Sequence, residues 1–126
     1  MPFEDGSFGT VFVLTSWAFL DDTPAVLAEA RRVLVAKGMF VNGYLDRDGI
    51  WGAGYLEKGR QGHGLFRHAR FASYAEVVGA TREAGFRVER TVSTLFSGPG
   101  EQSTPEPPRE GFERGASFVV VVARRA

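Results

Sequence analysis

The segments 10-TVFVLT-15, 23-TPAVLAEARRVL-34 and 39-MFVNGYL-45 decide the fold of this chain. The first and third are short runs of apolar, β-branched and aromatic residues, which favour β-strands. The second begins with a threonine cap and a proline at the first helical position, and it carries an apolar stripe at helical spacing: Val26, Leu27, Ala30, Val33 and Leu34. A strand, a helix and a strand of these lengths predict a βαβ unit and therefore a parallel sheet.

The rest of the chain adds one helix and two strands to this unit. Ser73-Tyr74-Ala75-Glu76 is a capping box, so we expect a helix from there to about Ala84, ended by Gly85. Strands are expected over 87–96 and 117–123. Residues 97–116 are rich in Pro, Gly and Glu and indicate a flexible loop. Residues 46–71 mix glycines with aromatic residues, which indicates a lid over a small organic substrate.

Composition excludes several classes of function. A chain of 126 residues suits a single domain over 1–126. Its 15 basic and 15 acidic residues cancel, which argues against nucleic acid and anionic membranes as partners. No apolar run approaches the roughly 20 residues that span a bilayer. The absence of cysteine excludes disulfides and fits a cytoplasmic protein, and Glu4 and Asp5 stand where a secretory signal needs cations.

The amino-terminal motifs resemble those of a known family. Residues 1–8 read MPFEDGSF, and 29-EARRVL-34 followed by Gly38 comes after the first strand. This order and spacing is similar to the second half of class I S-adenosylmethionine (SAM)-dependent methyltransferases of type 11. The family pattern has Leu-Pro-Phe-x-Asp-x-Ser-Phe-Asp and then Glu-x-x-Arg-Val-Leu-Lys-Pro-Gly-Gly. Two departures stand out: Gly9 replaces the final Asp of the first motif, and Ala36-Lys37-Gly38 replaces Pro-Gly-Gly.

The resemblance implies an α/β fold that is a partial Rossmann-like methyltransferase sheet. About four strands are expected, three parallel and the last antiparallel, with flanking helices. They would be the family's fourth to seventh strands, in the spatial order four-five-seven-six. The family's first strand and Gly-rich cofactor loop would lie upstream of Met1. We therefore expect Met1 to be an internal methionine of a longer parent protein.

The same resemblance implies where the cofactor SAM would lie. Ligands of doubly wound folds bind outside the carboxyl ends of the strands. The loop after the first strand would therefore face the methionine part of SAM, through Leu14, Thr15, Ser16 and Trp17. Core packing of Trp17 and Phe19 under this loop is an equally good interpretation, and both can hold together. Because the Gly-rich loop cannot be placed on any residue here, we expect SAM to bind the parent, and to bind this chain weakly or not at all.

Substrate residues are expected at the end of the second strand and in the 46–71 segment. The candidates are Tyr44, Trp51, Tyr55, His63 and His68. Either histidine could act as a general base near neutral pH, although a surface or hydrogen-bonding role is the commoner one. Two histidines and scattered carboxylates give no recognisable metal-ligand spacing, so no metal site is expected.

Three functional hypotheses follow. The first is methyl transfer from SAM to a small-molecule acceptor in the parent protein, with catalysis mainly by positioning. The second is a non-catalytic dimerisation or interaction domain, since the strand at 10–15 would keep a bare apolar edge through which two copies could pair as a homodimer. The third, a dehydrogenase half-domain, needs a nucleotide fingerprint after a strand, and the sequence has none.

Overall fold

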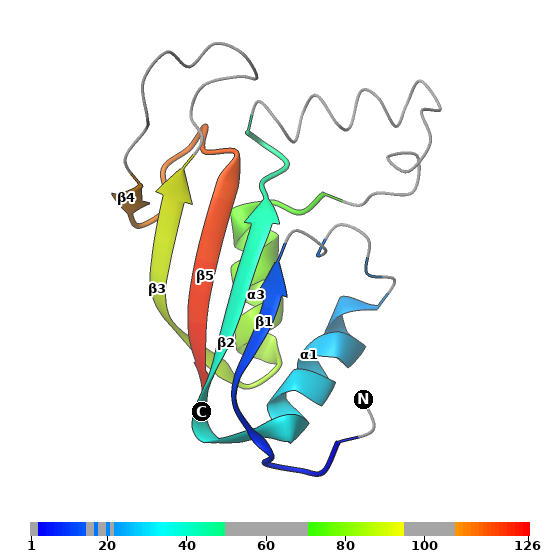
Figure 1. The fold of residues 1–126 in the computed structure, drawn as a ribbon. Coiled ribbons are helices and arrows are strands. Elements are labelled where there is room, and N and C mark those ends of the chain that lie inside the picture. Colours follow the sequence, from blue (N-terminus) through cyan, green and yellow to red (C-terminus); the bar gives the residue numbers. More distant parts are fainter. Residues whose placement is uncertain (1–2, 15–16, 18–19, 21, 50–70, 95–107) are drawn as a thin grey trace.

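The computed structural model describes residues 3–14, 17, 20, 22–49, 71–94 and 108–126 (Figure 1). Its elements follow in this order: β1 (Phe8–Leu14), α1 (Thr23–Val33), β2 (Leu34–Leu45), α3 (Tyr74–Glu83), β3 (Phe86–Thr94), β4 (Arg109–Glu110) and β5 (Phe118–Arg125). These bounds agree with the predicted helices and strands to within a few residues, except that β2 begins five residues earlier than expected. Most of the predicted 46–71 lid and most of the 97–116 loop lie outside the described residues.

The strands form one mixed sheet in the order β1-β2-β5-β3-β4. β1 pairs with β2 in parallel, with Thr10 opposite Met39 and Leu14 opposite Gly43. β5 lies antiparallel between β2 and β3. The predicted parallel pair and the inserted antiparallel strand are therefore confirmed. The strand count differs by one, because the two-residue β4 pairs with the outer edge of β3.

Helix α1 begins one residue earlier than its sequence suggests. The cap is Asp22 rather than Thr23, and its carboxylate accepts from the amide of Ala25 at 3.1 Å. The backbone turns extended at Leu34, which ends the helix. Leu27, Ala30 and Val33 form its buried face, as the apolar stripe predicts.

Helix α3 begins with the predicted capping box. The Ser73 hydroxyl accepts from the Glu76 amide, while the Glu76 carboxylate accepts from the Ser73 amide at 3.2 Å. Val77, Val78 and Thr81 are buried, and the Thr81 hydroxyl donates to the carbonyl of Val77 at 2.7 Å. The helix ends before Gly85, whose φ of +94° is a conformation that glycine adopts readily. A β-carbon at this position would lie 2.7 Å from Nε of Arg31, so a larger residue would also be too close to that side chain.

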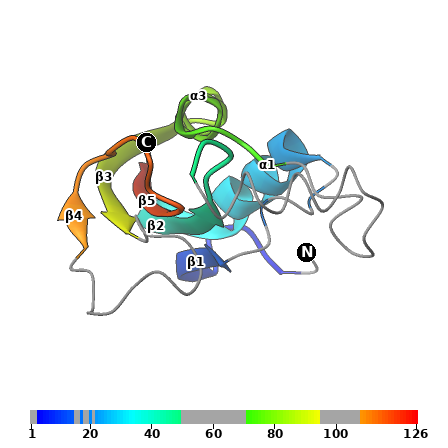
Figure 2. The ribbon, with the colours of Figure 1, turned by 90° about the horizontal axis from the view of Figure 1, so that it is seen from above.

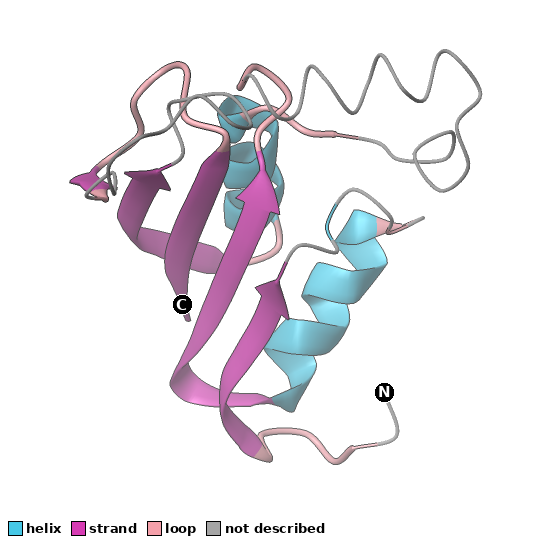
Figure 3. Cartoon of the chain, turned by 45° about the horizontal axis from the view of Figure 1, so that its top comes forward, coloured by secondary structure: helices cyan, strands magenta, loops and turns pink. Residues whose placement is uncertain are grey.

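Both helices cover the same face of the sheet (Figures 2 and 3). That helix-covered face contains Phe40, Asn42 and Tyr44 of β2, all fully or almost fully buried. The opposite face carries no described helix. We call it the open face; its apolar residues, assigned by strand pairing, are Phe12, Leu14, Val41, Leu45, Phe118, Val120 and Val122. Phe12 and Leu14 remain 63% and 57% exposed.

Arg32 holds the amino-terminal turn against α1. Its guanidinium donates to the carbonyl of Phe3 at 2.8 Å, to Asp5 at 2.7 Å and to Glu29 at 2.9 Å. The interaction with Arg32 is the main cause that lowers the pKa of Glu29 to about 2. The amide of Gly6 also donates to the carbonyl of Arg32. The apolar stripe of α1 predicts that Glu29 and Arg32 face solvent; both side chains are indeed partly exposed, and their hydrogen bonds also anchor the turn.

Candidate functional site

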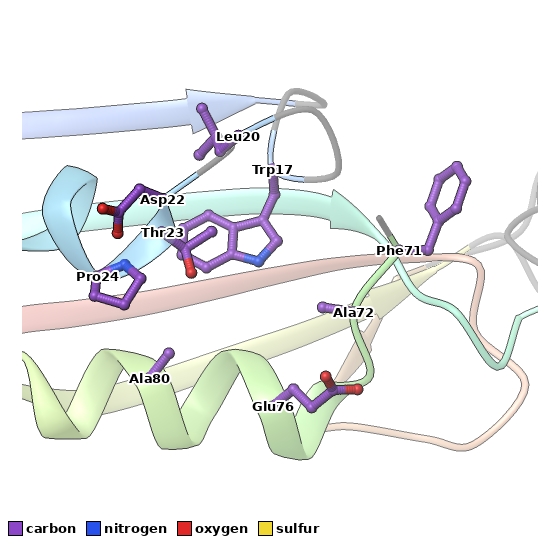
Figure 4. Close-up of a pocket in the computed structure, with 9 residues that line it drawn as sticks. All are labelled: Trp17, Leu20, Asp22, Thr23, Pro24, Phe71, Ala72, Glu76 and Ala80. Carbon is purple, nitrogen blue, oxygen red and sulfur yellow. The ribbon is translucent and has the colours of Figure 1, made fainter. Parts of the chain in front are cut away.

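A pocket opens at the carboxyl ends of β1 and β2, on the side of the helices (Figure 4). It encloses about 380 Å³, within the range typical of small-ligand sites. The segment after β1, the start of α1 and the start of α3 contribute its lining: Trp17, Leu20, Asp22, Thr23, Pro24, Phe71, Ala72, Glu76 and Ala80. It therefore lies in the crevice where α/β sheets bind their ligands.

Trp17 belongs both to this pocket and to the core. Its side chain is 5% exposed and packs in the cluster that includes Leu27, Tyr44 and Val77. Phe71, on the other side of the segment outside the described residues, is also buried and lines the same pocket. Both interpretations of Trp17, as pocket wall and as core residue, are therefore compatible with its position.

Two carboxylates line the pocket, and both belong to helix caps. The Asp22 side chain is on the exposed start of α1 and accepts from the amide of Ala25. Glu76 is more engaged, because it accepts from Ser73 and forms an ion pair with Arg47 at 2.8 Å. The Ser73 hydrogen bonds and the Arg47 charge lower the pKa of Glu76, so this carboxylate is ionised at neutral pH. The sequence pattern identifies Glu76 as part of a capping box but assigns the cap of α1 to Thr23 instead of Asp22, and it does not show that the two helix starts face one pocket.

Leu14 lies apart from this pocket. A β-carbon added at Gly43 would touch Cδ2 of Leu14 and the ring of Phe118, which places Leu14 on the open face. The predicted cofactor wall is thus divided, with Trp17 on the helix-covered side and Leu14 on the other. Thr15 and Ser16, the other two predicted cofactor residues, lie outside the described residues.

Tyr44 lies deeper than a substrate contact would require. Its side chain is 2% exposed, and its hydroxyl has no hydrogen-bond partner among the described residues. Burial, with a smaller contribution from the charge of Asp46, raises the pKa of Tyr44 well above its usual range, so the phenol stays neutral. The remaining predicted substrate residues, Trp51, Tyr55, His63 and His68, lie outside the described residues.

Tyr44 stands in a row of buried polar side chains on β2 and just beyond it. Neither amide atom of Asn42 has a partner in the described part of the chain. Asp46 is fully buried; one carboxylate oxygen accepts from the Asp48 amide at 3.0 Å and the other is unpartnered among these residues. Burial is the main reason why the pKa of Asp46 is raised. Asn42, Tyr44 and Asp46 alternate along the chain, a pattern that predicts one shared face of the sheet. How deeply this face is buried depends on the helices that cover it.

The described ranges contain neither a membrane-spanning helix nor a metal cluster. No described helix has the length and apolar character needed to cross a bilayer. No group of three or more metal-ligating side chains comes together within residues 3–14, 17, 20, 22–49, 71–94 and 108–126.

Comparison with known proteins identifies what the chain is similar to. Residues 1–42 match the family model described as a methyltransferase domain. The whole chain superposes with a TM-score of 0.90 and 35% identity on 60% of a Thermotoga maritima SAM-dependent methyltransferase, described as a possible histamine N-methyltransferase.

Two curated relatives agree with this match. The uncharacterized protein Rv2003c of Mycobacterium tuberculosis is 33% identical over 98% of this chain and 44% of its own length. The uncharacterized protein MJ1123 of Methanocaldococcus jannaschii is 30% identical over 99% of this chain and 60% of its own length. The chain thus spans about half the length of the curated relatives it matches.

Proposed function

We propose that this chain, which is class I SAM-dependent methyltransferase-like, builds the acceptor side of an enzyme that methylates a small molecule. The observation that carries this proposal is the TM-score of 0.90 at 35% identity over the whole chain. The pocket beside Trp17 supports it, since it lies at the carboxyl ends of the strands.

Of the predicted cofactor residues, we propose that Trp17 faces bound SAM from the helix-covered side, whereas Leu14 lies on the open face. Leu14 offers exposed apolar surface at the end of β1, and the Trp17 pocket lies beyond the same strand. A glycine-rich turn that joins a strand to a helix is absent from the described residues, and the sequence contains no such fingerprint. We infer that a further polypeptide segment supplies that turn. When bound, SAM would supply the electrophilic methyl group.

The pocket lining favours a small amine as the methyl acceptor. Trp17 and Phe71 provide aromatic surface, and Asp22 provides a carboxylate that is engaged by the amide of Ala25 in the helix cap. Aromatic faces and a carboxylate together attract ammonium groups. The Thermotoga maritima protein, described as a possible histamine N-methyltransferase, is consistent with an amine acceptor.

Catalysis in such a site consists mainly of holding the acceptor in line with the methyl group. The Trp17 ring would pack against the acceptor and orient it, and the Asp22 carboxylate would hold the acceptor nitrogen in position. The Ser73–Glu76 capping box holds the α3 side of the pocket in place. Because an ammonium group has no lone pair, the bound amine would have to lose a proton to solvent before its nitrogen could attack the methyl group.

A grafting experiment tests this proposal. This chain would replace the matched 60% of the Thermotoga maritima protein, and transfer of a radiolabelled methyl group from SAM to histamine and related amines would be measured. We expect the graft to transfer methyl groups and the isolated chain to show no transfer. A folded graft that binds SAM yet methylates no amine would contradict the amine acceptor.

Asp22→Asn in the graft tests the acceptor contact separately from folding. Asparagine caps a helix about as well as aspartate, so α1 should remain intact. We expect KM for the amine to rise about tenfold while kcat changes little, since loss of a charged contact costs about 1.4 kcal/mol or more. Asp48→Asn, an exposed carboxylate outside this pocket, is the matched control and should leave KM unchanged.

Self-association is a second candidate function, and the exposure of β1 favours it. Phe8, Phe12 and Leu14 are large exposed apolar residues of this single strand. In the described residues β1 pairs only with β2, and its sequence FGTVFVL has no charge or proline to protect its free edge. Antiparallel pairing of two copies, centred on Val11, would place Phe8 opposite Leu14 and Thr10 opposite Phe12, so that the pattern complements itself.

Cysteine cross-linking tests this homodimer. The chain has no cysteine, so Val11→Cys introduces a single thiol at the proposed two-fold axis. We expect oxidation to yield a covalent dimer, because directly opposite residues of antiparallel strands lie within disulfide reach. Val35→Cys, at an exposed apolar position outside β1, is the control and should form no covalent dimer on oxidation. A monodisperse monomer in sedimentation at micromolar concentration would exclude the homodimer.

A further inference from the structure

A second pocket lies at the opposite end of the sheet from Trp17. It encloses about 440 Å³ and is lined by Lys37, Arg87, Glu89, Arg124, Arg125 and Ala126. Lys37 lies in the first half of β2, Arg87 is the second residue of β3, and Arg124 and Arg125 end β5. The amino-terminal ends of β2 and β3 and the carboxyl end of β5 lie together at one end of the sheet (Figure 1). Because β5 runs antiparallel to its neighbours, its carboxyl end meets their amino ends, and the basic side chains gather there.

The side chains of this basic pocket are strongly unbalanced in charge. Four of them are cationic, and Glu89 is the single acidic side chain. The Glu89 carboxylate accepts from both Arg87 and Arg124 at 2.8 Å. The Glu89 carboxylate therefore holds two guanidinium groups in place. Ala126 adds the terminal carboxylate of the chain, so two carboxylates face four cations and positive charge remains in excess.

The backbone fixes the other basic side chains. Arg124 also donates to the carbonyl of Lys37 at 3.0 Å, and Arg125 donates to the carbonyl of Leu34. The amine of Lys37 has no hydrogen bond or ion pair to any described residue. The pocket thus combines three oriented guanidinium groups, those of Arg87, Arg124 and Arg125, with an ammonium group that is available to a ligand.

Lys37 itself has an unusual backbone. Its φ is +62°, and it is the only non-glycine residue with positive φ among the described residues. Left-handed backbone is unfavourable for a residue with a β-carbon, and glycine adopts it readily. Residues with strained backbone are often found at functional sites, and here the strained residue carries the available amine.

We propose that this basic pocket binds a compact polyphosphate, such as the diphosphate or triphosphate group of a small molecule. Guanidinium groups bind phosphate oxygens through paired hydrogen bonds, and lysine adds a point charge. A volume of about 440 Å³ suits a ligand of this size. The bound anion would bridge β2, β3 and β5 and stabilise the fold by binding the native state. This site is independent of the methyl-transfer pocket.

The variant Lys37→Gly separates this role from simple folding. Glycine removes the amine and also removes the backbone strain. We therefore expect the variant to unfold at a higher temperature than the wild-type chain without ligand. We expect its dissociation constant for inorganic pyrophosphate, measured by calorimetry, to be about tenfold weaker, as the loss of one charge-assisted contact implies.

Two controls make the result specific. Arg82→Gln removes an exposed cation of α3 outside the pocket and should change the pyrophosphate dissociation constant less than twofold. Sodium chloride at matched ionic strength should not reproduce the thermal stabilisation given by pyrophosphate. The proposal is overturned if Lys37→Gly binds pyrophosphate as well as the wild-type chain does, or if sodium chloride stabilises the chain equally.

Discussion

β1 and β2 are neighbouring parallel strands of similar composition, yet they differ sharply in burial. Phe40 of β2 is fully buried and packs on Phe86, with ring centroids 5.4 Å apart. Phe12 of β1, opposite Val41 on the open face, is 63% exposed. The sequences of β1 and β2 predict a strand equally well. Their different burial therefore depends on which faces and edges of the sheet the rest of the polypeptide covers.

The largest expected difference in the free energy of unfolding is between the alanine variants of Phe40 and Phe12. Phe40→Ala should lower the free energy of unfolding by about 3–5 kcal/mol, because it opens a cavity under the helices. Phe12→Ala should change it by less than about 0.5 kcal/mol, as is usual for exposed positions. Urea denaturation of both variants measures this contrast. A large loss from Phe12→Ala would mean that the open face is covered in solution.

A smaller effect, of opposite sign, is expected at Asn42 on the covered face of β2. Its amide atoms are buried and have no partner among the described residues, so Asn42→Leu should raise the free energy of unfolding by about 1–3 kcal/mol. Ser93 is the contrast, since its hydroxyl donates to the Gly111 carbonyl at 2.6 Å and accepts from the Glu113 amide. Ser93→Ala should destabilise the chain. Urea denaturation measures both changes. If Asn42→Leu and Ser93→Ala changed the free energy of unfolding in the same direction, this expectation would be contradicted.

The capping box provides a more modest test of the pocket wall. Ser73→Ala removes the reciprocal hydrogen bonds at the start of α3 and should cost about 1 kcal/mol of stability. Ser73→Asp, which preserves a capping oxygen, should restore most of it. Thermal unfolding followed by circular dichroism distinguishes the two. Full stability of Ser73→Ala would show that the capping box is not needed.

The subtlest effect is the pH dependence caused by Asp46. Burial raises the pKa of this carboxyl above 3.8, so the folded state binds the proton more tightly than the unfolded state. Ionisation in the fold therefore reduces stability as pH rises through the raised pKa, and the penalty is absent below pH 3.8. Asp46→Asn should be more stable than the wild-type chain at pH 7, with the gain shrinking as pH falls. A gain that is constant with pH would contradict the raised pKa.

Local sequence signals predict most of the fold. The Ser73–Glu76 box and Gly85 mark the ends of α3 because capping and turn chemistry depend on adjacent residues. The sequence does not predict β4, since Arg109 and Glu110 have no apolar pattern and their pairing depends on β3. Asp22 and Thr23 are both good caps, so the choice between them requires the backbone itself.

The candidate site is less predictable than the fold. Trp17 can be placed near the crevice because it follows a strand. The opposite placement of Leu14 cannot be deduced, since a strand that is apolar on both faces does not reveal which face the helices cover. The convergence of Asp22 and Phe71 on one pocket depends on tertiary packing between segments about 50 residues apart in the sequence.

Calorimetric titration of SAM into the isolated chain and into the Thermotoga maritima graft is the most direct test of the central proposal. The proposal predicts micromolar binding to the graft, in which β1 gains a neighbouring segment, and weak or undetectable binding to the isolated chain. Micromolar affinity in the isolated chain, or a folded graft that binds no SAM, would contradict it.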